Sequence, residues 1–401
     1  MGNQGFLIFD IFSVKAHYFF YMNDNFCCPK CGNQDSKYIG FRNGQAYCRR
    51  CLSFQGSEAA QRFYPKRNIK PLINYELTSN QSIISQKVVE NFKANSNTLI
   101  YAVTGAGKTE LVFAVIVEAL NQGLQVGFTI PRKDVVIELS ERLKSAFPTI
   151  EIAVVYGGHV DNLEGQIVIL TTHQLYRYPH YFDLLIFDEI DAFPFVDNDL
   201  LITMFRRSVR GNYVLMSATP SRQEINEFRS SDTLLTLFER FHHHPLPVPV
   251  LIIRILGFQY LYLLRKCQEW KKNAKPFLIF VPTIEQTEMV FRFINIFVKN
   301  GNYVHSLRER RAEIITSFKN KNLSFLVTTS VLERGITIEN LQVLIFNAHH
   351  PLFNQKALVQ ISGRVGRKLS APEGEVIFLA NEITREMEGA IADTKSKNQF
   401  L

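Results

Sequence analysis

The sequence predicts two α/β domains in series, each built around a parallel sheet, behind a small cysteine-rich module. Short apolar runs recur along the chain without polar–apolar alternation, and helix-like stretches separate them. This pattern is typical of strands that are buried on both faces of a parallel sheet. A proline-rich segment at residues 242–249 interrupts the pattern once, and five of the six cysteines lie near the start of the chain.

The chain of 401 residues is long enough for two or three domains of about 100–200 residues each. Hydrophobic residues make up 46% of it and charged residues 20%, which excludes a disordered tail, a collagen-like chain and a disulfide scaffold. We divide it into a lead (1–26), a zinc-finger module (27–71), an α/β domain (72–241), a linker (242–249) and a second α/β domain (250–401).

The expected strands are the apolar runs, and the expected helices lie between them. In the first domain the strands are expected at 98–103, 125–130, 152–155, 167–170, 184–187 and 213–216, with helices at 109–120 and 133–145. In the second domain they are expected at 277–281, 325–328, 343–347 and 375–379, with helices at 284–297 and 356–362. No apolar run reaches the roughly 20 residues of a membrane span, and no secretory leader is recognisable, so a cytoplasmic location is expected.

Basic residues exceed acidic ones, and the excess is concentrated early in the chain. The formal net charge is +8, and the segment from Cys27 to Leu72 carries nine basic residues against two acidic ones, or +7. A patch of this kind favours a polyanion such as nucleic acid or anionic lipid. The alternative is a solvated surface that keeps the protein in solution.

Four cysteines form two C-x2-C pairs, Cys28 with Cys31 and Cys48 with Cys51, sixteen residues apart. Two such pairs offer four thiolates, which satisfy the tetrahedral coordination of Zn²⁺. So small a segment has no core of its own, and metal binding would supply its folding free energy. Two disulfides are the alternative, which a cytoplasmic location disfavours. Cys27 does not fit the spacing and is expected to be a spare thiol.

A glycine-rich loop joins the first expected strand of the first domain to a helix, with the sequence Thr104-Gly105-Ala106-Gly107-Lys108-Thr109. Glycines let the backbone wrap around phosphate oxygens, and the N–H groups and helix N-terminus then face a polyanion. In this phosphate-binding loop, Lys108 is expected to reach the β- and γ-phosphates of a nucleotide. Thr109 is expected to hold Mg²⁺ through its hydroxyl.

Two further motifs complete a nucleotide-hydrolysing pattern. Asp188 ends an apolar run and can hold Mg²⁺, while Glu189 can orient and deprotonate the attacking water. In the second domain, Arg364 and Arg367 stand about one helical turn apart and can reach a γ-phosphate across a cleft between the domains. Each motif alone has a simpler reading, a solvated turn or a surface helix; together with the loop they predict ATP hydrolysis.

In order and spacing, these motifs and two more, at 217–219 and 328–337, resemble those of superfamily 2 helicases. The resemblance covers roughly residues 72–380 and implies two RecA-like domains with ATP between them. Residues 77–81 are similar to the Q-motif, which implies that Gln81 reads adenine. The four-cysteine finger, residues 240–249 and residues 332–337 resemble the ComFA family of Gram-positive competence. This resemblance implies a cytoplasmic ATPase that drives transforming single-stranded DNA inward through a membrane channel.

The resemblance also suggests how such a motor would grip DNA. Hydroxyl and basic groups at strand ends suit phosphates, and the candidate contacts are Pro131, Arg132, Thr171, Thr172, His173, Thr328 and Thr329. The basic cysteine module would add affinity without sequence preference. A membrane DNA-uptake channel, other competence proteins and further copies of the chain are candidate partners. Peripheral attachment at the inner face of the membrane is a candidate location.

Two alternatives stay open on the sequence. One is a replication-restart or RNA helicase, since these also combine such domains with zinc modules. The other is a zinc-dependent DNA-binding scaffold whose ATPase core is a switch without translocation. The quartet that ends at Asp191 reads DEID, so it does not settle RNA against DNA, and Thr337 stands where many relatives carry Asp.

Overall fold

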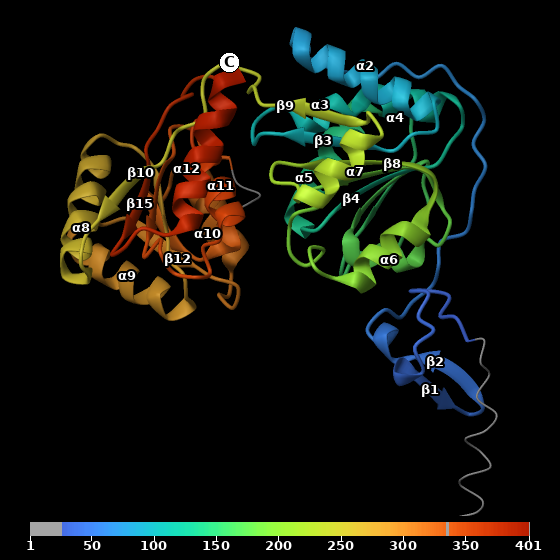
Figure 1. Ribbon diagram of the computed structural model, residues 1–401, viewed down its shortest axis with the longest axis horizontal. Helices are drawn as coiled ribbons and strands as arrows, with labels where there is room; N and C mark the ends of the chain where they lie inside the picture. The colour runs from blue at the N-terminus through green and yellow to red at the C-terminus, as the bar shows by residue number, and fades with distance from the viewer. Residues whose placement is uncertain (1–25, 334–336, 401) are drawn as a thin grey trace, which may run out of the picture.

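The computed structural model describes residues 26–333 and 337–400. The expected lead therefore falls almost wholly outside the described residues, as do Arg334, Gly335 and Ile336 of the second-domain motif. Two α/β bodies lie side by side, and the cysteine module adjoins the first of them, away from the second (Figure 1). No helix in the described part of the chain is long and apolar enough to cross a membrane.

The first domain is a seven-stranded sheet in the order β5-β6-β4-β7-β8-β3-β9, and every neighbouring pair is parallel. Its strands are β3 (Thr98–Ala102), β4 (Val126–Ile130), β5 (Ile152–Val155), β6 (Ile167–Thr171), β7 (Phe182–Asp188), β8 (Val209–Ser217) and β9 (Leu234–Leu237). Parallel strands end at the same edge, so this order brings the loops after β3, β4, β6, β7 and β8 to one side of the domain.

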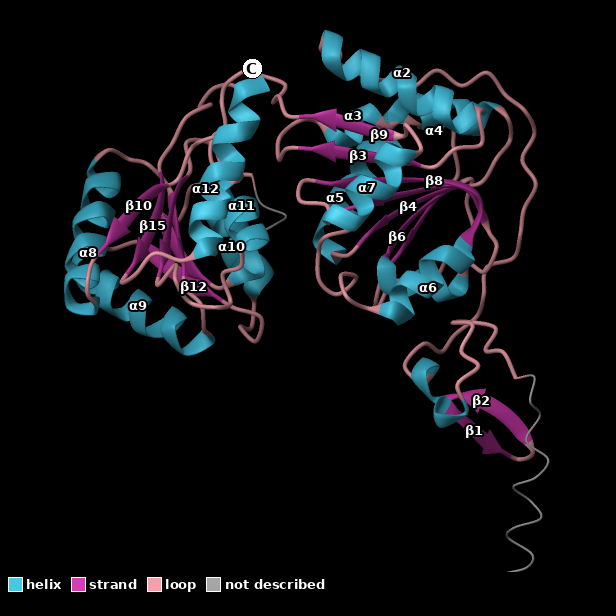
Figure 2. Ribbon diagram, in the orientation of Figure 1, coloured by secondary structure: helices cyan, strands magenta, loops and turns pink. Residues whose placement is uncertain are grey.

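Helices cover both faces of this sheet (Figure 2). They are α2 (Ser79–Lys93), α3 (Lys108–Leu111), α4 (Phe113–Asn121), α5 (Lys133–Ala146), α6 (Asp199–Ser208) and α7 (Arg222–Ser230), with a 3-10 helix η3 (Thr172–Arg177). Successive residues of one strand enter different cores because side chains alternate across the sheet. In β7, Ile186 packs with α2, α4 and α5, whereas Leu185 and Phe187 pack with α6 and η3.

The second domain repeats the design with a six-stranded parallel sheet in the order β10-β15-β14-β11-β13-β12. Its strands are β10 (Val250–Ile253), β11 (Phe277–Phe280), β12 (Gly301–Val304), β13 (Phe325–Thr328), β14 (Gln342–Phe346) and β15 (Val376–Ala380). Its helices are α8 (Leu256–Lys272), α9 (Ile284–Phe297), α10 (Arg311–Lys319), α11 (Gln355–Ser362) and α12 (Arg385–Lys397). The two parallel α/β sheets predicted from the sequence are therefore confirmed.

The central strands match the expected apolar runs to within a few residues, but three edge strands were not expected. These are β9, β10 and β12, each at the margin of its sheet. Their residues are mostly half-exposed, so they lack the continuous apolar run of a strand buried on both faces. The expected helix at 109–120 also divides at Val112 into α3 and α4.

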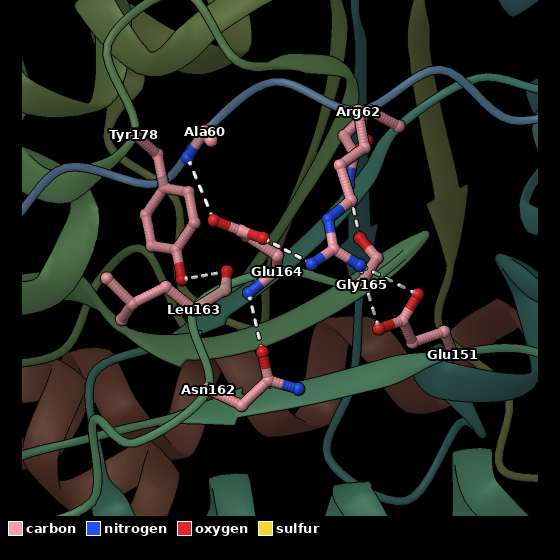
Figure 3. A network of polar contacts seen from close by, with 9 residues as sticks. Ala60, Arg62, Glu151, Asn162, Leu163, Glu164, Gly165 and Tyr178 are labelled. Carbon is pink, nitrogen blue, oxygen red and sulfur yellow. Dashed lines mark hydrogen bonds and ion pairs between the residues drawn. The ribbon is translucent and has the colours of Figure 1, made fainter.

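The cysteine module contains the antiparallel pair β1 (Ile39–Arg42) and β2 (Gln45–Cys48). Residues 55–70, here called the strap, then run along the first domain. In the strap, Arg62 lies between two carboxylates, with Nη1 3.2 Å from Glu151 and Nη2 2.5 Å from Glu164, and the Ala60 N–H also donates to Glu164 (Figure 3). Because these pairs are largely solvent-exposed, they hold the strap in register more than they stabilise the fold.

The core of the second domain offers a direct test of this packing. Phe280 is fully buried in β11, and its replacement by Ala should lower the free energy of unfolding of this domain by about 3–5 kcal/mol. Trp270, the single tryptophan, is buried in the same domain, so its fluorescence during urea denaturation reports this unfolding.

Phe258→Ala is the matched control, since that ring is 58% exposed on α8, and it should cost less than about 1 kcal/mol. Equal losses in the two variants would contradict the assignment of β11 to the core.

Candidate active site and cysteine cluster

The phosphate-binding loop lies between β3 and α3, at the carboxyl edge of the first sheet. Gly105 and Gly107 adopt left-handed φ values of +86° and +76°, which the loop needs in order to curl around a ligand. The Lys108 ammonium donates to the Ala102 carbonyl over 3.3 Å. Burial lowers the pKa of Lys108 and the nearby Arg367 adds to this, while the carboxylates of Asp188, Asp191 and Glu189 oppose it. An anionic ligand would stabilise the buried ammonium.

Gln81 is buried beside this loop, on the first turn of α2. Its Nε2 donates to the Ala106 carbonyl over 2.8 Å, and its Oε1 accepts the Thr78 N–H over 2.9 Å in a capping box. A glutamine amide has a second N–H and a second lone pair. The side chain can therefore brace the loop and still offer hydrogen bonds to a base.

The acidic residues follow β7 directly opposite the loop. Asp188 is the last residue of the strand, and burial raises its pKa to about 6 although Lys108 opposes the shift. Its Oδ1 accepts the Glu189 N–H over 2.8 Å. Glu189 has a φ of +59°, a conformation that a non-glycine residue adopts at a cost of roughly 1–3 kcal/mol. This left-handed conformation turns the chain sharply after the strand.

Asp191 joins three elements, a role that the sequence analysis did not assign to it. Its carboxylate accepts from Ser217 Oγ at 2.9 Å, at the end of β8, and from Thr219 Oγ1 at 2.5 Å, two residues after the strand. It also accepts from Gln360 Nε2 at 3.1 Å, on α11 of the second domain. The acidic quartet therefore bonds directly across the interface. The signal was present, since all four residues fall in the motifs that led to the resemblance.

The second domain approaches the loop with the end of α11. A Cβ on Gly363 would lie 1.9 Å from Thr104 Oγ1, so only glycine allows this approach. Arg364 is buried and its Nε donates to the Glu333 carbonyl over 2.7 Å. Arg367 is half-buried, and its Nε donates to the Gly363 carbonyl over 2.8 Å. Its positive charge lies close enough to lower the pKa of Lys108. The structure thus brings the lysine of one domain and Arg367 of the other to a common interface.

The candidate nucleic-acid contacts follow three strands, at the carboxyl edges of the sheets. Pro131 and Arg132 follow β4, Thr171 to His173 end β6 and begin η3, and Thr328 and Thr329 end β13. Pro131 and the four threonines are buried, whereas Arg132 is half-buried and His173 is exposed. The buried side chains leave mainly backbone groups for a ligand at those positions, and Arg132 also pairs with Asp134 at 3.0 Å.

The four paired cysteines come together as the spacing predicted. Their sulfur atoms all lie within 4.8 Å of one another and are buried, with Cys28–Cys51 at 3.8 Å and Cys31–Cys48 at 3.7 Å. A zinc ion with Zn–S bonds of about 2.3 Å requires sulfur separations of about 3.8 Å, whereas a disulfide requires about 2.05 Å. The donor set therefore fits Zn²⁺ and does not fit two disulfides.

The thiols perturb one another in this cluster. The adjacent Cys51 thiol lowers the pKa of Cys28 to about 4, whereas burial raises the pKa of Cys31 to about 11. The cluster therefore favours one thiolate, and the charge of any further thiolate would be repelled by it. A divalent cation bound by the four sulfur atoms would offset this repulsion. Cys27 is exposed and stands outside the group of four.

The module packs on the first domain through η3, a contact that sequence reasoning missed. Phe54 stacks on His173 and meets Tyr176 edge-on, with ring centroids 6.3 and 5.5 Å apart. Tyr176 Oη donates to the Gln55 carbonyl over 2.7 Å, and Arg207 Nη2 donates to the Pro29 carbonyl over 2.8 Å. The cysteine cluster is therefore part of the apolar core on that face of the sheet.

Solved structures share this two-domain arrangement. Yeast Dbp5 bound to RNA and ADP BeF3 superposes with a TM-score of 0.61 at 14% identity, covering 81% of this chain and 88% of that one. RecG bound to a three-way DNA junction gives a TM-score of 0.59 at 19% identity, covering 81% of this chain and 47% of that one. At such identities the likeness shows the fold alone, two RecA-like helicase domains.

Sequence relatives narrow the assignment. Residues 82–228 match the DEAD/DEAH box helicase family, and residues 259–368 match the helicase conserved C-terminal domain. The chain is 32% identical to competence protein ComFA of Streptococcus pneumoniae, over 93% of this chain and 90% of that protein. It is also 32% identical to competence protein ComFA of Bacillus subtilis, over 93% and 86%. The chain is an ATP-hydrolysing, helicase-like enzyme of superfamily 2 and belongs to the ComFA family.

Proposed function

We propose that the protein is an ATP-driven motor that moves single-stranded DNA inward during natural competence. Its membership of the ComFA family and its two helicase domains support this function. The observation that carries it is the interface itself, where the Lys108 ammonium lies near the carboxylates of Asp188, Glu189 and Asp191 in its own domain and near Arg367 of the other. Within the division of the chain that we propose, residues 72–241 bind the nucleotide and residues 250–401 respond to it.

In the proposed reaction, ATP lies between the two domains. The backbone of residues 104–107 and the Lys108 ammonium bind its phosphates, and Gln81 contacts the adenine. Thr109 and Asp188 would hold Mg²⁺, which neutralises charge on the phosphates. Glu189 orients the attacking water and accepts its proton, and Arg364 and Arg367 stabilise charge on the γ-phosphate. Loss of that phosphate removes the bridge and opens the cleft.

DNA would cross the carboxyl edges of both sheets. Arg132 and His173 contact phosphates through their side chains, and Pro131, Thr171, Thr172, Thr328 and Thr329 border the path through their backbone. If the two domains grip the strand alternately, each cycle moves it in one direction. The basic cysteine module, held together by Zn²⁺, adds affinity for the DNA backbone beside His173. If the protein attaches to the inner face of the membrane beside an uptake channel, it would receive the incoming strand there.

Lys108→Ala should lower ATP turnover by about 10²–10³-fold, because the transition state loses its buried ammonium. Steady-state turnover in saturating single-stranded DNA measures this. Lys87→Ala is the matched control, since Lys87 is an exposed lysine on α2 that pairs with Glu90 at 3.4 Å, and it should leave turnover unchanged. Normal turnover in Lys108→Ala would refute the assignment of the phosphate-binding loop.

Single-stranded DNA should stimulate ATP turnover more than duplex DNA or RNA does. Arg132→Ala should weaken its binding and reduce the slope of log affinity against log salt by about 1, as expected for one lost phosphate contact. Titrations at two or more salt concentrations measure both effects, with the exposed Arg292 on α9 as the alanine control. Stronger stimulation by RNA would favour an RNA helicase, and no stimulation by any polymer would favour a non-translocating switch.

A Cys28→Ser, Cys31→Ser double variant should lose its zinc, falling from about one ion per chain to none, because two of four thiolates are gone. Elemental analysis of the purified protein measures this. Cys27→Ser should keep the ion, since that neighbouring cysteine is exposed and outside the cluster. Zinc retained in the double variant would contradict the four-thiolate site.

A further inference from the structure

Arg240 lies at the junction of the two domains, and although it begins the segment 240–249 that resembles the ComFA family, no role was assigned to it above. It follows β9, and although it is an arginine only 1% of it is exposed. Long charged side chains are almost never so deeply buried unless they are paired. In the described part of the chain, however, no carboxylate pairs with it, and its partners are backbone carbonyl groups.

Those carbonyl groups belong to the two halves of the active site. Nε of Arg240 donates to the Thr104 carbonyl in the phosphate-binding loop over 3.2 Å. Nη1 donates to the carbonyls of Val365 and Gly366 over 2.9 and 2.7 Å, in the turn between Arg364 and Arg367. One rigid, planar guanidinium therefore spans from the phosphate-binding loop to the arginine-bearing turn.

The turn that Arg240 holds is tightly constrained at Gly366. Gly366 has a φ of +68°, and a Cβ there would lie 2.1 Å from the Pro372 carbonyl oxygen. The Gly366 carbonyl accepts a second bond from His242 Nε2 at 2.9 Å. His242 Nδ1 accepts the His244 N–H over 3.2 Å, so Nε2 carries the proton and the ring is neutral. Arg240 and His242 thus converge on the Gly366 carbonyl, one of the two carbonyls between Arg364 and Arg367.

This burial is costly to the fold. Burial and the nearby Arg367 charge lower the pKa of Arg240 to about 9, and its Nη2 has no hydrogen-bond partner among residues 26–333 and 337–400. A buried cation that is satisfied only by neutral carbonyls costs several kcal/mol. A hydrophobic side chain would fill the space at lower cost but would bridge nothing. The cost is therefore consistent with a role in which the bridge itself matters.

We infer that Arg240 is a positioning residue for ATP hydrolysis, which couples the phosphate-binding loop to the turn that carries Arg364 and Arg367. When the loop closes on a triphosphate, the Thr104 carbonyl moves with it. The guanidinium carries that displacement to the carbonyls of Val365 and Gly366. The displacement positions the side chains of Arg364 and Arg367. Arg240 itself is not assigned a contact with the reacting atoms.

Two substitutions test this inference. Arg240→Ala removes the bridge, whereas Arg240→Lys keeps the charge, but its ammonium cannot span both sets of carbonyls as a planar fork can. Both should lower kcat for ATP by about 10- to 100-fold, the loss expected for a charged hydrogen bond, while KM for ATP changes less than about threefold. Small-angle scattering should show that ADP with beryllium fluoride compacts the wild-type protein and not the variants.

His243→Ala is the control, three residues further along the chain. His243 is exposed and pairs with Glu239 on its own side of the junction, so this variant should keep wild-type kcat and compaction. The inference is overturned if Arg240→Lys keeps wild-type kcat and compaction. It is also overturned if either variant raises KM at unchanged kcat, which would make Arg240 a simple binding residue. If Arg240→Ala does not fold, the lysine variant alone decides.

Discussion

The structure depends on one constraint: the phosphate-binding loop of the first domain and the glycine-rich turn of the second must touch. Gly363 has no side chain because Thr104 occupies the space that a Cβ would need. Around this contact lie the cross-domain bond from Gln360 to Asp191 and the guanidinium of Arg240. The contact joins the carboxyl edge of the first sheet to the turn that follows α11, so any ligand that changes it changes both domains at once.

Sequence patterns predicted the central strands because a strand buried on both faces reads as an unbroken apolar run. They did not predict the edge strands β9, β10 and β12, whose residues are mostly half-exposed. In the site, too, some residues could be predicted from local sequence and others could not. Lys108 and Asp188 stand in local patterns with a chemical meaning, whereas Arg240 gains its place only through contacts between residues more than 120 positions apart in the sequence. Its neighbours in the chain carry no signal for that contact.

The cysteine module, whose four thiols fit a Zn²⁺ ion, packs closely on the first RecA-like domain. Its sulfur cluster continues the apolar core around η3, and Phe54 stacks on His173, a candidate DNA contact. The strap then runs along the domain, with Arg62 between two carboxylates. If the cluster holds Zn²⁺, its loss would therefore disturb the surface beside the expected DNA path, as well as the module. Charge and spacing in the sequence predicted the cluster and its basic character, but not this docking.

The most direct test of the account is a structure of the protein with single-stranded DNA and ADP with beryllium fluoride. The account predicts that the Lys108 ammonium and the guanidinium groups of Arg364 and Arg367 all lie within hydrogen-bonding distance of the fluoride group that mimics the γ-phosphate. A cleft in which both arginines point away from that group, with the loop still occupied, would contradict it.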